Sequence, residues 1–191
     1  MADKANGYEA RAANFIASRT PSIGPAIVRE WARALPPGAS ILDIGCGHGI
    51  PISQALIRDG FNVSGIDASE TMITKFRENC HNATAECSAV EQSTFFDQTF
   101  DGVVAWGLLF LLPPATQKIV IGKVALTLKP QGRFLFTSPR EEASWIDALT
   151  GLESTSLGYE VYRQELDTHG LMLLGDAKDE GDNFYYFAMK P

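Results

Sequence analysis

The sequence predicts an α/β fold in which helices cover a doubly wound, mostly parallel sheet. Ile41, Leu42 and Ile44 are aliphatic residues of the kind that a buried parallel strand uses. Three glycines follow at every second position, and residues 50–58 then carry apolar residues at helical spacing. A buried strand, a glycine turn and a helix in this order are typical of the first unit of such a sheet.

Two helices are expected before this unit. Apolar residues recur at helical spacing from Tyr8 to Ile16, and residues 22–35 read as a second helix that ends before a Pro-Pro-Gly segment. We therefore expect residues 1–36 to form a helical cap on one side of the sheet.

The later elements alternate along the chain. Ser69 is placed to cap a helix, and Pro113-Pro114 begins another, because proline is tolerated in the first helical turn. The last two strands are joined by a linker too short for a crossover helix, so they should form an antiparallel hairpin. The expected strands are residues 61–66, 83–87, 101–105, 133–137, 170–174 and 183–189, and the expected helices are residues 70–79 and 114–128.

The glycine turn and an acid on the second strand indicate the kind of ligand. A dinucleotide fingerprint spaces its glycines G-x-G-x-x-G, whereas Gly45, Gly47 and Gly49 read G-x-G-x-G. Asp67 ends the second strand 22 positions after Gly45, where a carboxylate accepts hydrogen bonds from both ribose hydroxyls. The pattern predicts an adenosine site without a pyrophosphate. A dehydrogenase built on the same turn is the alternative.

Four segments in order resemble the class I S-adenosylmethionine-dependent methyltransferases of the small-molecule, bacterial type. Residues 42–49 and 65–69 look like the first two motifs of that family, and residues 100–104 and 126–135 look like its fourth strand and the turn into its fifth. The resemblance implies a Rossmann-like, doubly wound seven-stranded sheet of order 3-2-1-4-5-7-6 with the last strand antiparallel. It also implies S-adenosyl-L-methionine as the cofactor, S-adenosyl-L-homocysteine as its product, and methyl transfer to a small molecule.

The resemblance implies roles for several residues around the turn. Asp43 would brace the turn and orient the amino group of the donor, and Asp67 would hold the ribose. A backbone amide at Ala68 would reach the ribose or the adenine, and Met72 would press on the adenine ring or be plain core. The turn residues expected at the donor are Gly45, Cys46 and Gly47.

The segment after the third strand departs from the family pattern. The aspartate that often binds the exocyclic amine of adenine is absent, and Ser88 could accept the same hydrogen bond. The backbone of Ala89 or Val90 would read the ring edge, and Glu91 is expected to be an exposed helical residue.

The N-terminal helices have two interpretations. They either simply cover one side of the sheet or close over the donor. The second interpretation needs a cation for the carboxylate of the donor and an aromatic face for its sulfonium. Tyr8 and Arg19 are residues of these kinds.

The segment after the fourth strand should hold the acceptor. No acid, lysine or histidine occurs from Trp106 to Phe110, so the catalytic residues stay unassigned. The lack of an acidic cluster near this strand argues against a metal ion. Residues 139–157 are either a substrate lid that carries Trp145 or a surface excursion on a crossover helix, and residues 150–158 are expected to be too polar for the core.

The turn of the C-terminal hairpin should return to the same edge of the sheet. It carries Asp179, Glu180 and Asp182, which are expected to be solvated. The alternative is that one of them, or His169, steers a cationic or amine substrate. The candidates for the acceptor pocket are Trp106, Trp145 and His169.

Length and composition limit the function further. The 191 residues, 45% of them apolar, suit one domain that spans residues 1–191. A net charge of −7 argues against a nucleic-acid partner, and no run is long and apolar enough for a membrane span. The three cysteines have no metal-ligand spacing and an odd count, which suits reduced thiols in the cytoplasm.

Two other functions stay open. A protein or RNA methyltransferase would need a groove for a large acceptor, and a non-catalytic S-adenosylmethionine-binding protein would keep the same glycine turn. The sequence does not indicate an oligomeric state.

Overall fold

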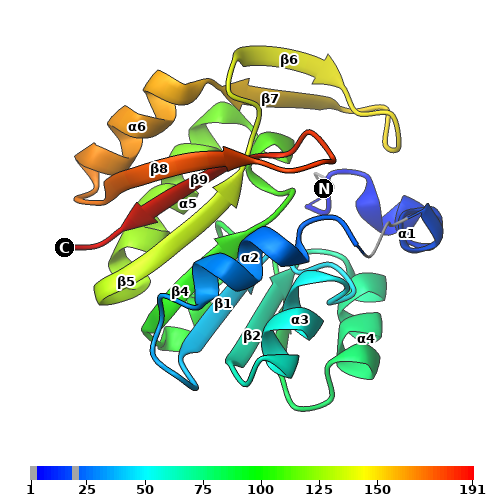
Figure 1. The fold of residues 1–191 in the computed structure, drawn as a ribbon. Helices are drawn as coiled ribbons and strands as arrows, with labels where there is room; N and C mark the ends of the chain where they lie inside the picture. The colour runs from blue at the N-terminus through cyan, green and yellow to red at the C-terminus, as the bar shows by residue number, and fades with distance from the viewer. Residues whose placement is uncertain (1–3, 19–21) are drawn as a thin grey trace.

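The computed structural model describes residues 4–18 and 22–191, and Figure 1 shows a sheet with helices on both faces and a separate hairpin. The helices are α1 (Tyr8–Ser18), α2 (Pro25–Ala32), α3 (Ile52–Arg58), α4 (Glu70–Asn79), α5 (Pro114–Thr127) and α6 (Tyr159–Thr168), with the short 3₁₀ helices η1 (Phe95–Asp97) and η2 (Leu109–Leu111). The strands are β1 (Ser40–Ile44), β2 (Asn62–Asp67), β3 (Thr84–Cys87), β4 (Phe100–Ala105), β5 (Leu128–Thr137), β6 (Glu142–Ile146), β7 (Glu153–Leu157), β8 (Met172–Lys178) and β9 (Phe184–Met189). None of the helices in these two ranges has the length and apolar character that a membrane crossing requires.

Seven strands form the main sheet in the order β3-β2-β1-β4-β5-β9-β8. Neighbouring strands are parallel as far as β5, and β9 runs antiparallel to both β5 and β8. Because β8 and β9 are the sixth and seventh strands of this sheet along the chain, the predicted order and the antiparallel last strand are confirmed. The strand order reverses between β1 and β4, and open α/β sheets bind ligands at the carboxyl ends of such strands.

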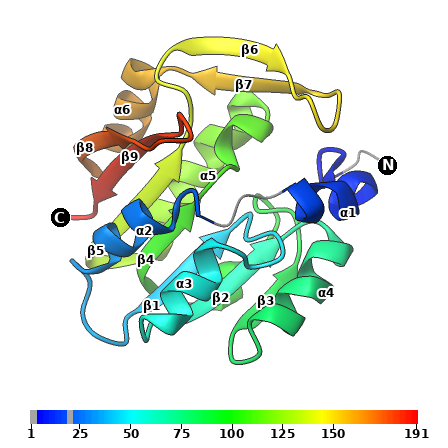
Figure 2. The same cartoon turned by 45° about the vertical axis from the view of Figure 1, so that its right-hand side comes forward.

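Alternate side chains of the central strands enter two apolar cores. Ile41 and Val104 pack with α2 and α3, whereas Leu42 and Val103 belong to the core under α5 and α6. Figure 1 shows α2 and α3 in front of the sheet and α5 behind it, and Figure 2 shows the same arrangement from a second direction. Burial on both faces explains why β1 and β4 are rich in apolar residues and could be recognised in the sequence.

Stacked aromatic rings build the core under α6. The rings of Phe136 on β5 and Tyr186 on β9 are parallel within 2° with their centroids 4.5 Å apart, and the ring of Tyr162 packs edge-on against Phe136. The Tyr162 hydroxyl donates to Oε1 of Gln117 at 2.6 Å, so the polar end of this buried side chain is paired. Aromatic pairs of this kind stabilise a core beyond the area that they bury.

Residues 139–157 differ from the predicted loop or crossover helix. They contain β6 and β7, which pair in an antiparallel hairpin outside the main sheet, and the crossover helix is α6. The prediction that residues 150–158 are too polar for the core is wrong, because Ser156 is fully buried. Its hydroxyl donates to the carbonyl of Pro139 at 2.7 Å and accepts from the amide of Gly158, so the buried hydroxyl of Ser156 is paired.

The fifth strand begins earlier than predicted. β5 starts at Leu128, directly after α5, and this residue pairs with Phe100 on β4. The register then shifts before Gly102, next to the part of β5 that contains Pro130 and Gly132. Proline and glycine are unfavourable inside a regular strand, so the sequence pattern shows only the regular second half.

Replacement of Phe136 by alanine is expected to lower the free energy of unfolding by about 3–5 kcal/mol, because it removes a buried ring and leaves a cavity. The matched control is Leu126→Ala on α5. Leu126 is 82% exposed, so we expect a change within about 0.5 kcal/mol. Urea unfolding followed by circular dichroism measures both variants. Equal losses in the two variants would contradict the central place of Phe136 in the core.

Candidate functional site

β1 leads into a turn whose backbone favours glycine. Gly45 and Gly47 have φ angles of +72° and +53°. A Cβ added to Gly47 would meet only the ring of Phe15, at 4.0 Å, so this part of the turn faces open space. The amides of Gly45 and Cys46 both donate to the carbonyl of Ile66, at 2.8 and 3.0 Å, which ties the turn to β2.

Asp67, the last residue of β2, is held beside this turn. Its Oδ2 accepts from the amide of Gly47 and its Oδ1 from the amide of Ser69, each at 2.9 Å. Burial raises the pKa of the Asp67 carboxyl, and the charge of Glu9 raises it further, while the two amides lower it. Because a carboxylate oxygen can accept more than one hydrogen bond, both oxygens keep capacity for ligand hydroxyls.

Asp43 lies on β1 and is 2% exposed. Its Oδ2 accepts from the Ser53 hydroxyl on α3 at 2.5 Å, a partner that a buried carboxylate needs. Burial, with the charge of Asp43 next in size, raises the pKa of the Cys46 thiol well above its usual value and that of Cys80 to about 11. Both thiols are therefore protonated at neutral pH and are poor nucleophiles. The described part of the chain holds no group of three or more His, Cys, Asp or Glu side chains suited to a metal ion.

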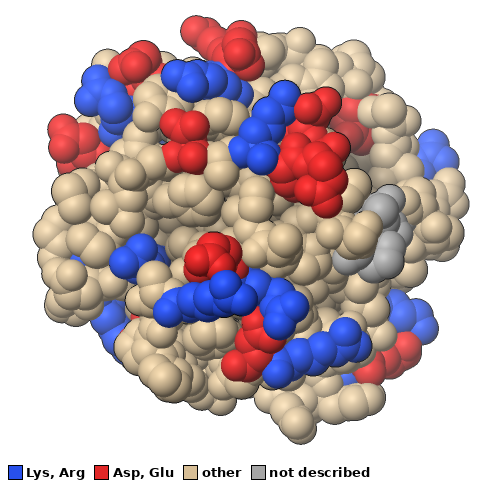
Figure 3. Space-filling model, viewed as in Figure 1, with Lys and Arg blue, Asp and Glu red and all other residues tan. Residues whose placement is uncertain are grey.

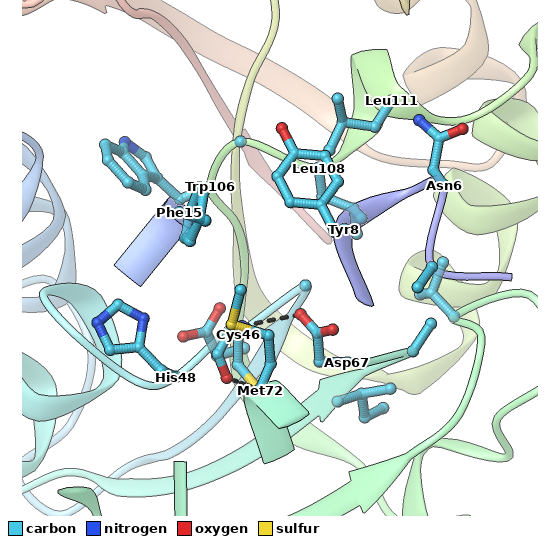
Figure 4. Close-up of a pocket in the computed structure, with 18 of the residues that line it drawn as sticks. Asn6, Tyr8, Phe15, Cys46, His48, Asp67, Met72, Trp106, Leu108 and Leu111 are labelled. Carbon is cyan, nitrogen blue, oxygen red and sulfur yellow. Dashed lines mark hydrogen bonds between the residues drawn. The ribbon is translucent and has the colours of Figure 1, made fainter. Parts of the chain in front are cut away.

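These groups line a cavity of about 200 Å³. Figure 4 shows Cys46, Asp67 and Met72 on one side of it and Tyr8 and Leu108 on the other. Met72 is both a buried core residue and a lining residue, so its place in the core is confirmed and its contact with adenine stays a prediction. Of the residues expected at the donor, the cavity is lined by Tyr8, Asp43, Gly45, Cys46, Gly47, Asp67, Ala68, Met72, Ser88, Val90 and Trp106.

The other expected residues lie elsewhere. Ala89 is buried behind the cavity wall, and Arg19 lies outside the described residues. Trp145 lines a second, adjoining cavity. The prediction that His169 is a pocket residue is wrong: it is exposed, and its ring lies against Gly122 of α5. His169 ends α6 just before β8, a strand parallel to the central ones, so it lies at the opposite edge of the sheet.

Sequence reasoning missed part of the cavity wall. Phe15 and Leu108 line it, and the apolar run after Trp106 was the signal for Leu108. Asn6 also lines it, with φ +46° and a buried Nδ2 that has no hydrogen-bond partner among the residues described. Glu91 was predicted on an exposed helix, which is wrong, because it is partly buried in a turn at the cavity.

Trp106 forms a side wall that the last hairpin positions. Its Nε1 donates to the Tyr185 hydroxyl at 2.8 Å, and that hydroxyl donates to Oδ2 of Asp179 at 2.7 Å. Oδ1 of Asp179 accepts from the amides of Gly181 and Asn183. Burial acts to raise the pKa of Asp179, but these hydrogen bonds outweigh it and the pKa is lowered. The prediction of a solvated Asp179 is therefore wrong, because its carboxylate holds the β8–β9 turn together.

α1 connects two parts of the fold beside the cavity. Glu9 accepts hydrogen bonds from the Ser69 hydroxyl and from the amide and hydroxyl of Thr71 at the start of α4. The Tyr8 hydroxyl donates to Oδ2 of Asp147, in the β6–β7 turn, at 3.5 Å. Figures 1 and 2 both show α1 next to this turn. One short helix thus joins α4 to the β6–β7 hairpin.

Comparison with known sequences finds a family match and relatives. Residues 41–132 match a family model described as a methyltransferase domain. The chain is 31% identical over 121 residues to a ubiquinone biosynthesis O-methyltransferase of Coxiella burnetii, a match that covers 61% of this chain and 50% of that protein. A protein of the same name from Photobacterium profundum is 32% identical over 123 residues, with 61% and 51% covered. The chain spans about half the length of the curated relatives it matches.

Solved structures share the fold over nearly the whole chain. An amino pentose methyltransferase from Micromonospora echinaspora with bound S-adenosylmethionine has a TM-score of 0.72 at 14% identity, covering 95% of this chain and 96% of that one. A TehB-like S-adenosylmethionine-dependent methyltransferase from Corynebacterium glutamicum has a TM-score of 0.71 at 20% identity, covering 97% of both chains. At these identities the likeness shows the fold.

Replacement of Glu9 by glutamine is expected to loosen α1, because a neutral amide accepts weaker hydrogen bonds from Ser69 and Thr71. Amide hydrogen exchange in α1, followed by mass spectrometry, should become about fivefold faster, which corresponds to about 1 kcal/mol. The control is Glu30→Gln on α2, whose partner Arg33 is also exposed and lies on the same face of that segment. Exchange in α1 that stays the same in Glu9→Gln would show that these contacts do not hold the helix.

Proposed function

We propose that this chain, whose residues 41–132 match a methyltransferase domain, is a class I S-adenosylmethionine-dependent methyltransferase that binds S-adenosyl-L-methionine in the cavity beside β1 and β4 and transfers the methyl group to a small molecule. The observation that carries this proposal is the Asp67 carboxylate, which the amides of Gly47 and Ser69 hold beside a turn that faces open space. A carboxylate in this position is suited to both hydroxyls of a ribose.

The residues around the cavity fit this ligand. Asp67 would hold the ribose, and Ala68 and Met72 would lie against the adenine. The buried Nδ2 of Asn6 is a donor that a nitrogen or oxygen of the bound molecule would satisfy. At the other end, Asp43, braced by Ser53, would receive the amino group beside the turn, which contributes Gly45, Cys46 and Gly47.

The remaining assignments concern the adenine edge and the sulfonium. Ser88, with the backbone of Ala89 and Val90, would read the edge of the adenine ring. The rings of Tyr8 and Phe15, whose centroids lie 5.5 Å apart, and that of Trp106 offer aromatic faces for a sulfonium. Arg19, outside the described residues, would pair with the donor carboxylate.

The chain's own residues would act by positioning. When bound, S-adenosylmethionine would supply an electrophilic methyl carbon and a thioether leaving group that keeps the electron pair of the carbon–sulfur bond, and a proton on the acceptor would pass to water. Holding two reactants in line can supply about 7–11 kcal/mol of the barrier. Trp106 and Leu108 exclude water from the cavity wall. Since no acid, lysine or histidine occurs from Trp106 to Phe110, we assign no general base.

A small-molecule acceptor in the cytoplasm fits the remaining observations. The relatives carry names such as ubiquinone biosynthesis O-methyltransferase and amino pentose methyltransferase, and a net charge of −7 disfavours nucleic acid. The free cysteines Cys46, Cys80 and Cys87 suit a reducing compartment. Within one domain of residues 1–191, residues 1–36 would cap the donor and residues 139–157 would act as a lid on the acceptor.

Replacement of Asp67 by alanine is expected to weaken S-adenosylhomocysteine binding about 30-fold or more, because hydrogen bonds to a charged group contribute about 1.5–3 kcal/mol each. Calorimetric titration should give a dissociation constant in the micromolar range for the unchanged protein. The control is Asp167→Ala, an exposed carboxylate on α6. An unchanged affinity in Asp67→Ala would remove the ribose assignment.

The affinity for S-adenosylhomocysteine is also expected to fall at low pH. Burial raises the pKa of Asp67, so the charged form that accepts ribose hydroxyls is lost at a higher pH than in an ordinary aspartate. The affinity for S-adenosylhomocysteine should therefore fall on acidification before the usual aspartate range is reached. Asp67→Asn should bind weakly with a flatter profile, and an equally steep profile in that variant would rule out Asp67 as the titrating group.

A further inference from the structure

A second cavity, of about 420 Å³, adjoins the first and is not used by the donor assignments above. The two cavities share Phe110 and Asn183 in their walls. The second one lies at the carboxyl end of β5, between β6 and the start of β9, and Thr137 and Phe184 line it there. A molecule in it would meet the first cavity at Phe110.

Aromatic side chains from three different elements line this second cavity. They are Phe110 on η2, Trp145 on β6 and Phe184 on β9. The rings of Phe110 and Trp145 contact each other, with centroids 5.6 Å apart and planes tilted by 42°. Aromatic walls of this kind bind a flat ring by offset or edge-on contact. The cavity therefore favours a planar ring.

Lys178 forms an ion pair with one of the two acids that line this cavity. Its Nζ lies 2.8 Å from Oδ1 of Asp182, and Asp182 first and Glu141 last among the causes raise the pKa of Lys178. Figure 3 shows acidic and basic side chains side by side over the β8–β9 turn, where this pair lies. Together with Arg140, which also lines the cavity, these charged residues sum to zero, so the lining has no net preference for a cation.

Arg140 is the other cation that lines the second cavity. Its guanidinium carbon lies 4.7 Å from the ring centroid of Tyr159 and 5.7 Å from that of Phe184. It has no carboxylate within ion-pair distance in residues 4–18 and 22–191. Stacking uses the face of a guanidinium and leaves the N–H groups along its edge, which match a carboxylate with two parallel hydrogen bonds.

We propose that the second cavity binds the methyl acceptor and that this acceptor is a planar aromatic carboxylate. Its ring would pack on Phe110 and Trp145, and its carboxylate would bind the edge of Arg140. A hydroxyl or amino group on the ring would then face the first cavity at Phe110. The inference rests on the proposed function, because the donor must occupy the first cavity.

The test measures binding instead of turnover. Protein saturated with S-adenosylhomocysteine is titrated calorimetrically with a hydroxybenzoate and an aminobenzoate, then with the benzamide of the same ring and with a benzylamine. The carboxylates should bind at least about tenfold more tightly than the neutral amides, a difference of about 1.4 kcal/mol. Equal affinities, or tighter binding of the amine, would overturn the proposal.

Variants test separately the roles of Arg140 and of the aromatic wall in binding the carboxylates. Arg140→Ala should abolish the preference for the carboxylate, and Arg140→Lys should retain part of it, because lysine keeps the charge without the planar fork. Trp145→Ala should weaken carboxylate and amide alike. The control is Arg163→Ala, an exposed residue of α6 that pairs with Glu160. A carboxylate preference that survives in Arg140→Ala would overturn the assignment.

The two levels of the proposal fail separately. If S-adenosylhomocysteine itself does not bind, the proposed function fails. If it binds and the aromatic carboxylates do not, the donor site stands and the acceptor class is wrong.

Discussion

Two hydrogen bonds accepted by one partly buried carboxylate organise the ligand edge of this protein. Through the amides of Gly47 and Ser69, Asp67 joins the turn after β1 to the start of α4. The Ser69 hydroxyl then accepts from the amide of Met72 in the first turn of α4 and donates to Glu9, which docks α1. Burial works against the charge on Asp67, and such an unfavourable charge is typical of a site kept for binding.

The main sheet could be predicted because its central strands are recognisable from their own residues. Ile41, Leu42 and Ile44 place apolar side chains on both faces of β1, and the resemblance of four segments supplied the strand order, which the structure confirms. The β6–β7 hairpin could not be predicted in the same way. Its buried Ser156 reads as a loop residue, because the partners that make its burial tolerable, Pro139 and Gly158, are recognisable only once the chain has folded.

At the cavity, too, residues placed by the strands could be predicted, and residues placed by side-chain contacts could not. Asp67 ends β2 and Ser88 follows β3, so strand order alone brings them to one edge, whereas Asn6 and Phe15 come from an N-terminal segment whose docking depends on side-chain contacts. His169 was misplaced for a different reason. It precedes a parallel strand, and strand direction puts such a residue at the opposite edge from the cavity.

The three tryptophans lie in three different parts of the molecule, so their fluorescence can report on each part. Trp106 stands in the wall of the first cavity, Trp145 in the wall of the second, and Trp31 in the core beneath α2. The fluorescence of an indole ring depends on its surroundings, and the ring of Trp31 is buried in the core. Variants that keep a single tryptophan would therefore report ligand binding in each cavity separately, without an added dye.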